Sequence, residues 1–152
     1  MIESVIDRIK EYYLELLPFN KVLGIEIISL DYETGEAVTC FDMKHDLIGN
    51  SAHGILHGGV TASVIDLTGG LSALVSCARF NLDEPVEVIE KKLTSSATID
   101  MRVDYLRPGR GKRFTCTSRL IRAGSRIVVS KIDLENEKQI TIATGTASYL
   151  IG

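Results

Sequence analysis

The sequence predicts an α+β domain in which an antiparallel sheet of about six strands wraps around one long central helix. Residues 58–78 contain a single charged residue, Asp66, among apolar and small residues, which is typical of a helix buried on nearly all sides. Stretches of alternating apolar residues, separated by turn signals, flank that helix on both sides. A sheet of this size must bury one face, and the central helix is the element apolar enough to fill it.

Length and composition favour a single domain over residues 1–152. The chain has the usual size of one domain, and 45% hydrophobic residues is ordinary for a globular protein. A net charge of −3 provides no general attraction for nucleic acid. The start of the sequence shows no basic and apolar leader, so we expect no secretory signal. Asp66 interrupts an apolar run that is otherwise almost long enough to cross a bilayer, so we expect no membrane span.

The cysteines lie far apart, are odd in number and form no CxxC pair. This usage predicts three reduced, buried thiols in a cytoplasmic protein. They are Cys40, Cys77 and Cys116.

The N-terminal third predicts a helix followed by a hairpin. Apolar residues recur at helical spacing between charged residues over residues 1–18, which predicts an amphipathic helix that ends near Pro18. Residues 24–32 and 37–43 are rich in β-branched side chains, and residues 33–36 between them have turn composition, so they predict a β-hairpin. The following segment, 44–56, shows no period and predicts a loop.

The central helix is expected over residues 57–79. Gly69 and Gly70 would each cost a helix interior about 1 kcal/mol relative to alanine, so we expect them to let strands or another helix approach closely. The next segment, 79–96, contains Pro85 and a charged patch. A short surface helix and a mobile connection both fit it.

Four strands are expected after this segment. Residues 98–106 alternate apolar and charged side chains, and residues 107–111 have the composition of a turn. Further strands are expected at 114–122, 127–134 and 140–151, joined by tight turns. Four sequential strands with tight turns predict an antiparallel meander.

A motif in this framework indicates a family. His57-Gly58-Gly59 is followed, nine residues after the histidine, by Asp66, and the strand at 98–106 leads into Arg107-Pro108. Together these features resemble the PaaI-like acyl-CoA thioesterases, including a bacterial branch acting on medium- and long-chain acyl-CoAs. The resemblance covers residues 20–152 and is strongest at 49–70 and 98–111.

The resemblance implies a hotdog fold and hydrolysis of acyl-CoA to free fatty acid and CoA, without a cofactor. It also implies a homodimer whose sheets join edge to edge, with a dimer of dimers as a further possibility. The loop before the motif is one residue longer than the spacing common in that family, and the segment 79–97 is longer than in its short members. We expect that segment to form a lid or rim over the acyl pocket.

The residue types of the motif suit thioester hydrolysis. The first-turn amide of Gly58 has no partner inside the helix and can stabilise an oxyanion. Asp66 can activate water as a general base or attack as a nucleophile, and the sequence leaves both open. At the family's Ser/Thr position, Thr98 could orient that water. Asn50 could donate to the thioester carbonyl, and His57 is expected to orient the loop.

A local excess of positive charge indicates where CoA could bind. Nine basic residues and one acidic residue lie between Arg102 and Lys131, and arginine suits phosphate through bidentate hydrogen bonds. Gly59 would let the substrate approach the backbone. A solvated surface is the alternative explanation of the excess. The residues expected to hold the CoA phosphates are Arg107, Arg110, Lys112, Arg113 and Arg126.

Each assignment has a simpler alternative. Asp66 could form a structural ion pair with Arg102. Thr98 could merely begin a strand, and Asn50 could form an Asx turn. A metal site is not expected, because the spacing of the remaining candidates matches no known ligand pattern. Those candidates are His45, His53 and His57 with Asp46.

Two other classes of function stay open. A non-hydrolytic hotdog enzyme, such as a dehydratase acting on acyl thioesters, would use a histidine with an acid, and His57 with Asp66 would meet that need. A non-enzymatic acyl-CoA sensor is the other class, although pure binding gains nothing from a lone buried acid.

The distance between two candidate residues predicts a site shared by two subunits. Gly58 and Asp66 are eight residues apart, which is about 12 Å along a helix and about 80° around it. One thioester is too small to reach both. Two copies of the helix running antiparallel across a two-fold axis would bring Gly58 of one copy to Asp66 of the other. The small residues expected to allow this approach are Ala62, Ser63, Gly69 and Gly70.

Overall fold

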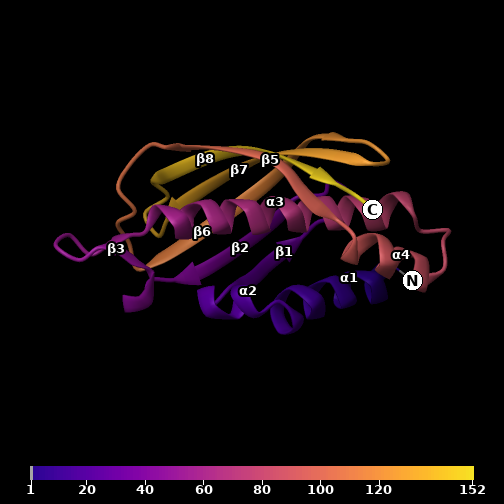
Figure 1. Ribbon diagram of the computed structural model, residues 1–152, viewed down its shortest axis with the longest axis horizontal. Coiled ribbons are helices and arrows are strands. Elements are labelled where there is room, and N and C mark those ends of the chain that lie inside the picture. Colours follow the sequence, from indigo (N-terminus) through magenta and orange to yellow (C-terminus); the bar gives the residue numbers. More distant parts are fainter. Residues whose placement is uncertain (1) are drawn as a thin grey trace.

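The structure, a computed structural model, describes residues 2–152 and consists of three layers (Figure 1). A sheet lies on one side of the long helix α3, and the N-terminal helices lie on the other. The helical elements are α1 (Ile2–Glu11), the π-helical turn η1 (Tyr12–Leu16), α2 (Pro18–Leu23), the 3-10 turn η2 (His45–Leu47), α3 (Gly58–Phe80) and α4 (Val86–Thr94). The strands are β1 (Glu26–Leu30), β2 (Ala37–Asp42), β3 (Ile48–Asn50), β4 (Ile55–Leu56), β5 (Ala97–Tyr105), β6 (Arg113–Ala123), β7 (Ile127–Asn136) and β8 (Thr141–Leu150).

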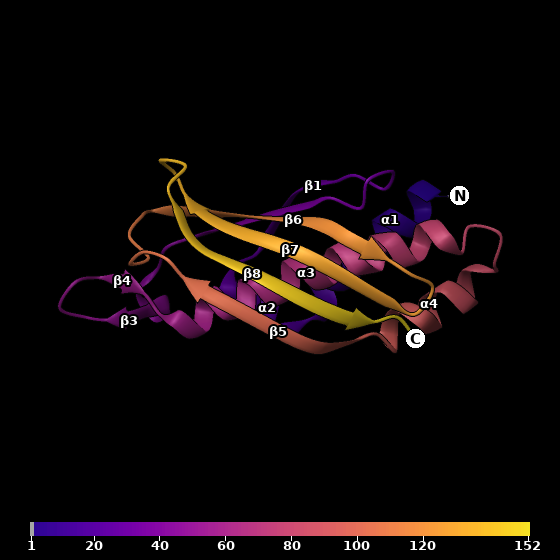
Figure 2. The ribbon, with the colours of Figure 1, turned by 90° about the horizontal axis from the view of Figure 1, so that it is seen from above.

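The main sheet has six antiparallel strands in the order β1-β2-β6-β7-β8-β5. The predicted fold class, an antiparallel sheet around a long central helix, is therefore confirmed. Figure 2 shows the sheet lying over α3, with β5 along one border.

The predicted four-strand meander is wrong, because only β6, β7 and β8 follow one another in space. β5 instead pairs with β8 at the edge of the sheet. The connection at residues 106–112 therefore passes the ends of β8 and β7, a span of about 14 Å across three strand spacings. Its glycines and proline indicated correctly that the chain bends there. They carried no information about which strand the returning chain would join.

The core lies between α3 and the inner face of the sheet. Ile65, Leu71 and Val75 of α3 are fully buried, as are Phe114 of β6 and Ile132 of β7. Burial of each such side chain contributes about 1.5–3 kcal/mol to the free energy of folding. The predicted central helix is confirmed, and 72% of its most apolar stretch is buried inside the protein. By length and composition α3 could cross a membrane, but its burial identifies it as the core helix.

The first helical run ends at Leu16, near Pro18 as predicted, but a second helix that was not predicted begins at that proline. The first helix was expected to include residue 1, which lies outside the described residues. After α1 the chain continues through η1, and only Leu17 leaves the helical region, with φ −99° and ψ 103°. Pro18 then begins α2, because a proline needs no amide partner at the first position of a helix while it forces the preceding residue to be extended.

Two connecting segments are more ordered than their sequences indicated. The expected loop at 44–56 contains η2 and the short β3–β4 hairpin, which projects from one end of the molecule (Figure 1). Of the two alternatives for 79–96, the structure has the short helix, α4. Ile89 and Leu93 anchor it in the core.

The glycine pair of α3 accommodates two tyrosines. A Cβ on Gly69 would lie 2.2 Å from Oη of Tyr149, and one on Gly70 would lie 2.9 Å from Oη of Tyr13. A strand and the N-terminal helical segment thus approach the helix closely, as expected. These neighbours belong to the same chain, so packing within one subunit already accounts for both glycines, and their contact with a second copy of the helix stays a prediction.

Candidate active site

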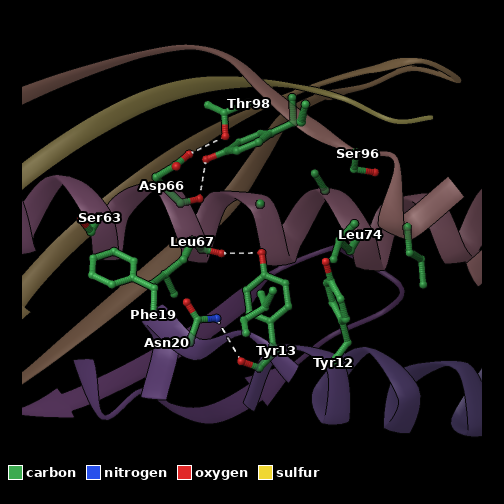
Figure 3. A pocket seen from close by; sticks show the side chains of 16 residues that line it. Tyr12, Tyr13, Phe19, Asn20, Ser63, Asp66, Leu67, Leu74, Ser96 and Thr98 are labelled. Atoms are coloured by element: carbon green, nitrogen blue, oxygen red, sulfur yellow. Dashed lines mark hydrogen bonds between the residues drawn. The ribbon is translucent and has the colours of Figure 1, made fainter. Parts of the chain in front are cut away.

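Asp66 lies in the middle of α3, half-buried, at a cavity of about 310 Å³. The cavity is bounded by α3, by the N-terminal helical segment and by the junction between α4 and β5 (Figure 3). Thr98 donates its hydroxyl to the Asp66 carboxylate at 2.8 Å. The structure therefore brings together two of the residues that the sequence indicated for catalysis, and their catalytic roles stay a prediction.

A β-bulge turns Thr98 toward Asp66. Strict alternation along β5 would place Thr98 on the outer face of the sheet, with Asp100 and Arg102. The pairing with β8 shifts register between Thr98 and Asp100, and the extra residue Ile99 is 53% exposed. Because a bulge inserts one residue into a strand, it reverses the facing of the residues that precede it. Thr98 consequently faces α3.

The structural ion pair considered for Asp66 is not formed. Arg102 lies on the outer face of the sheet and pairs with Asp104 at 3.0 Å. The Asp66 carboxylate is thus exposed to the cavity and held by a neutral hydroxyl, an arrangement that leaves it free to accept a proton.

Two buried phenols hold the backbone around Asp66. Oη of Tyr149 donates to the carbonyl oxygen of Asp66 at 2.8 Å, and Oη of Tyr13 donates to that of Leu67 at 3.1 Å. Burial, followed by the negative charge of Asp66, raises the pKa of both tyrosines above the ordinary value of 10.0. Both phenols therefore remain protonated donors at neutral pH.

The N-terminus of α3 presents a free amide. His57 caps the helix, with Nδ1 accepting the amide hydrogen of Gly59 at 2.8 Å. The Gly58 amide has no partner among the described residues, and the dipole of α3 makes this end positive. Oη of Tyr105 donates to the carbonyl oxygen of Gly58 at 2.8 Å and holds the first turn in place.

Gly58 and Asp66 open into different cavities. Gly58 lines a second cavity of about 400 Å³, together with Thr61, Tyr105 and Arg107. Asp66 does not line that cavity, and Gly58 does not line the first. One chain by itself therefore does not gather the carboxylate and the free amide around a single thioester.

Asn50 lies away from both cavities. It ends β3 in the projecting hairpin, is exposed, and accepts the amide hydrogen of Ala52 through Oδ1 at 3.1 Å. This is the Asx turn considered as its simpler alternative.

The five basic residues expected around the CoA phosphates do not form one cluster. Arg113 is engaged by Glu26 at 3.0 Å and Asp42 at 2.8 Å, so its charge is already neutralised. Arg126 follows the far end of β6, about 33 Å from Arg113 along an eleven-residue strand. Within one chain, therefore, Arg113 is occupied by carboxylates and Arg126 lies apart from the other three basic residues.

Three of the basic residues stay together in the connection after β5. Arg107 donates to the carbonyl oxygen of Thr141 at 2.8 Å, and Arg110 donates to that of His53 at 3.4 Å. Lys112 is anchored through its backbone amide, which donates to Glu137. The side-chain charges of all three remain without a carboxylate partner among the described residues. Gly59, the other residue expected to contact CoA, has its amide occupied by His57.

The described residues contain no group of three or more His, Cys, Asp or Glu side chains that could hold a metal ion. His57 is used as a helix cap, and it lines neither of the two cavities. All three cysteines are buried and unpaired.

Sequence reasoning missed the tyrosines and the N-terminal segment as parts of the site. Four residues of this segment line the cavity of Asp66, namely Tyr12, Tyr13, Phe19 and Asn20. The first two were assigned only to an amphipathic helix, and the last two to no element. Two adjacent glycines in a buried helix were the available signal, because such a pair marks where bulky neighbours press against the backbone.

Comparisons with known proteins identify the family and the fold of the chain. The family model described as thioesterase superfamily matches residues 53–143. The medium/long-chain acyl-CoA thioesterase YigI of Salmonella typhimurium is 41% identical over 150 residues, which cover 99% of this chain and 96% of that protein. The crystal structure of a protein from Shewanella oneidensis related to the thioesterase superfamily matches with a TM-score of 0.94 and 42% identity. The match covers 99% of this chain and 97% of that protein. The PaaI protein of Escherichia coli matches with a TM-score of 0.77 at 23% identity. This match covers 100% of this chain and 96% of PaaI and shows that the two share a fold.

Proposed function

The chain belongs to the thioesterase superfamily, and we propose that it hydrolyses medium- and long-chain acyl-CoA thioesters to free fatty acid and CoA, with Asp66 as the reacting carboxylate. The observation that carries this assignment is the hydrogen bond of Thr98 to Asp66 at the wall of a cavity large enough for an acyl group. The YigI relatives are named for that activity. The three unpaired thiols fit a cytoplasmic location.

The chemistry needs an activated oxygen nucleophile and a stabilised oxyanion. Asp66 either takes a proton from a water that attacks the thioester carbon, or attacks that carbon itself to form an anhydride that water then opens. In both routes the C–S bond breaks, water supplies the new oxygen, and CoA leaves as the thiol. Thr98 orients the carboxylate, and the Gly58 amide donates to the carbonyl oxygen as it becomes negative. In a single turnover in isotopically labelled water, label in the Asp66 carboxylate would identify the nucleophilic route, because it enters only when water opens the anhydride at the Asp66 carbon.

Each site combines two subunits. Gly58 and Asp66 of one chain line different cavities, whereas β5 contacts both residues through opposite ends, Asp66 through Thr98 and Gly58 through Tyr105. β5 is also an edge strand whose outer side has no partner strand in the described part of the chain. Pairing with the same strand of a second copy, about a two-fold axis near Arg102, would cover that edge.

This pairing would complete the site. Because paired antiparallel strands run in opposite directions, the Thr98 end of one β5 would meet the Tyr105 end of the other. Asp66 of one subunit would then face Gly58 of the partner subunit, and symmetry would produce two equal sites. Ala62 and Ser63, half-buried on α3, would lie at the contact. Such dimers could pair further into a tetramer.

The nucleotide of CoA is expected at the connection after β5. Arg107 lines the cavity that contains Gly58, and Arg110 and Lys112 follow it. Their free charges are therefore close to the amide that receives the thioester oxygen, and guanidinium groups bind phosphate oxygens in pairs.

Two variants with matched chemistry test the function. Asp66→Asn keeps the shape of the side chain but removes the carboxylate, so release of free thiol from acyl-CoA should fall by a factor of at least about a hundred. Asp7→Asn changes an exposed carboxylate on α1 and should leave the rate unchanged. Melting temperatures recorded on both variants establish that they are folded. A folded Asp66→Asn protein with a normal rate would exclude Asp66 as the reacting group.

The same thiol-release assay separates hydrolysis from the other two classes of function. A dehydratase-like enzyme releases no thiol, and His57, the histidine it would need, is already engaged as the cap of α3, where its Nδ1 accepts the amide hydrogen of Gly59. A sensor binds acyl-CoA and releases no thiol at any enzyme concentration.

A further inference from the structure

The cavity of Asp66 extends along one side of α3 well beyond the carboxylate. Ser63, Asp66, Gly70 and Leu74 succeed one another on that side at intervals of three or four residues. Figure 3 shows Phe19 and Ser63 at one end of the cavity and Tyr12, Leu74 and Ser96 at the other. From Asp66 to Leu74 the helix advances about 12 Å.

The wall opposite α3 comes from residues 12–20, outside the residues matched by the family model. The π-helical turn η1 sets the direction of Tyr12 and Tyr13, and Pro18 restarts the helix so that Phe19 and Asn20 face the same cavity. π-helical turns interrupt α-helices at functional positions more often than elsewhere. The side-chain amide of Asn20 donates to the carbonyl oxygen of Tyr13 at 3.0 Å and fixes the two halves of this wall together.

Most polar side chains that line the cavity are already paired within the chain. Ser63 donates to the carbonyl oxygen of Gly59 at 2.7 Å, and Ser96 donates to that of Lys92 at 2.9 Å. Tyr13, Tyr149, Asn20 and Thr98 have the partners given above. An occupant therefore meets few unsatisfied donors or acceptors apart from Asp66 and the Tyr12 hydroxyl, which favours an apolar body, since an unpaired buried polar group on it would cost about 1–3 kcal/mol.

From these observations we infer that residues 12–20 form the wall of the acyl-chain site and that Tyr12 limits the length of acyl chain that the site accepts. The identity of the ligand in this inference rests on the proposed function. The occupant is an unbranched alkyl chain of about ten carbons. The cavity volume of about 310 Å³ holds about ten groups the size of a water molecule, at about 30 Å³ each. The 12 Å path matches the same number, at about 1.3 Å of advance for each C–C bond of about 1.5 Å.

Tyr12 is the residue best placed to set this limit. It is half-buried, and its ring points toward Leu74 at the end of the cavity away from Phe19 (Figure 3). Its ring packs edge-on against that of Tyr13, with centroids 6.2 Å apart. Replacement by alanine opens that end of the cavity, replacement by tryptophan shortens it, and replacement by phenylalanine keeps its size while removing the hydroxyl.

Binding of alkyl-CoA thioethers tests the inference without relying on hydrolysis. These analogues carry a C–S–C linkage in place of the thioester. In the wild-type protein the Kd should fall about fourfold for each added methylene until the chain fills the cavity, and then level off. The levelling point, which is the chain length at which the Kd stops falling, should move to longer chains in Tyr12→Ala and to shorter chains in Tyr12→Trp. It should not move in Tyr12→Phe. Leu16→Ala is a matched control, because Leu16 belongs to the same turn, is 64% exposed and does not line the cavity.

The outcomes separate this inference from the proposed function. A Kd that does not depend on chain length, or a levelling point that stays the same in both Tyr12→Ala and Tyr12→Trp, overturns the inference even if acyl-CoA is hydrolysed. Conversely, a protein that releases no thiol but shows the shifted levelling points retains the inference and loses the proposed hydrolysis. If Tyr12→Ala fails to fold, the shift toward shorter chains in Tyr12→Trp decides.

Discussion

Thr98 and Asp66 are separated by 32 positions in the sequence and joined by a hydrogen bond of 2.8 Å. The bond exists because β5 carries one extra residue, Ile99, which turns Thr98 from the outer face of the sheet toward α3. It fixes the orientation of the carboxylate and couples it to the edge strand. The same strand holds the first turn of α3 through Tyr105. Any movement of β5 would therefore displace both halves of the proposed chemistry.

Thr98→Val should lower kcat about ten- to a hundredfold, because a hydrogen bond to a charged group contributes about 1.5–3 kcal/mol. KM should change little, since the hydroxyl orients the carboxylate rather than the acyl chain. Thr98→Ser keeps the hydroxyl and should retain most of the rate. Steady-state kinetics on both variants, with melting temperatures, provide the measurement. Equal kcat values in the valine and serine variants would show that the hydroxyl is not used.

Gly69→Ala should destabilise the protein by about 1–3 kcal/mol, because its Cβ would lie 2.2 Å from Oη of Tyr149 in a packed core. Tyr149→Phe removes that oxygen, so the double variant should lose less stability than the sum of the two single variants. Urea unfolding of the four proteins gives the coupling free energy. Strictly additive losses would mean that the tyrosine does not occupy the space left by the glycine.

The sequence allowed the central helix and most of the strands to be predicted, because a long apolar run and alternating β-branched residues report burial directly. It did not allow the position of β5 to be predicted, since the glycines and proline at 107–111 indicate a bend and not the strand that the chain then joins. Alternation alone would place Thr98 on the outer face, and it does not report the bulge, because a bulge is a property of the pairing with β8. Pro18 correctly marked the end of the first helical run, but the second helix that begins at this proline was not predicted.

The candidate site was predictable where one local motif contains its residues and not where distant segments meet. His57, Gly58 and Asp66 belong to one helix and its cap, so their spacing in the sequence fixes their relative positions. The wall formed by residues 12–20 depends on how the N-terminal segment packs against α3, which no local pattern specifies. Likewise, the ion pairs that neutralise Arg113 come from β1 and β2, far away in the sequence.

Stability should fall as the pH rises above 9. Burial raises the pKa of the Cys116 thiol from 9.0 to about 12, so between these values the unfolded chain releases a proton that the folded chain keeps. The free energy of unfolding then decreases with pH by about 1.4 kcal/mol per unit for this proton. In Cys116→Ala this share of the slope should disappear, as measured by urea unfolding at several values between pH 8 and about 10. Parallel slopes in the two proteins would contradict the buried thiol as a source of the effect.

Binding of acyl-CoA should weaken with salt through Arg107 and Arg110, whose charges lack a carboxylate partner within the described part of the chain. Replacing both with glutamine should raise KM for acyl-CoA about tenfold or more and leave KM for a short acyl thioester without the nucleotide almost unchanged. Arg113→Gln is the matched control, because that guanidinium is occupied by Glu26 and Asp42. Equal effects on both substrates would mean that these arginines form an ordinary solvated surface.

Two inactive variants should restore activity when their subunits are mixed. Gly58→Pro removes the free amide, and proline is compatible with the first position of α3 because His57 before it is already extended, with φ −63° and ψ 133°. Asp66→Asn removes the carboxylate. If each site combines Gly58 of one subunit with Asp66 of its partner, a mixed dimer contains one site with both lesions and one site with neither.

Random exchange of equal amounts should therefore return about a quarter of the wild-type activity per subunit, since half of the dimers are mixed and each of these has one intact site. Thiol release from acyl-CoA gives the activity, and mass spectrometry of isotopically labelled subunits under native conditions gives the extent of exchange. Each variant exchanged with itself is the control and should stay inactive. Complete exchange without recovered activity would show that one subunit contains the whole site, with a water or the substrate bridging the two cavities that Gly58 and Asp66 line.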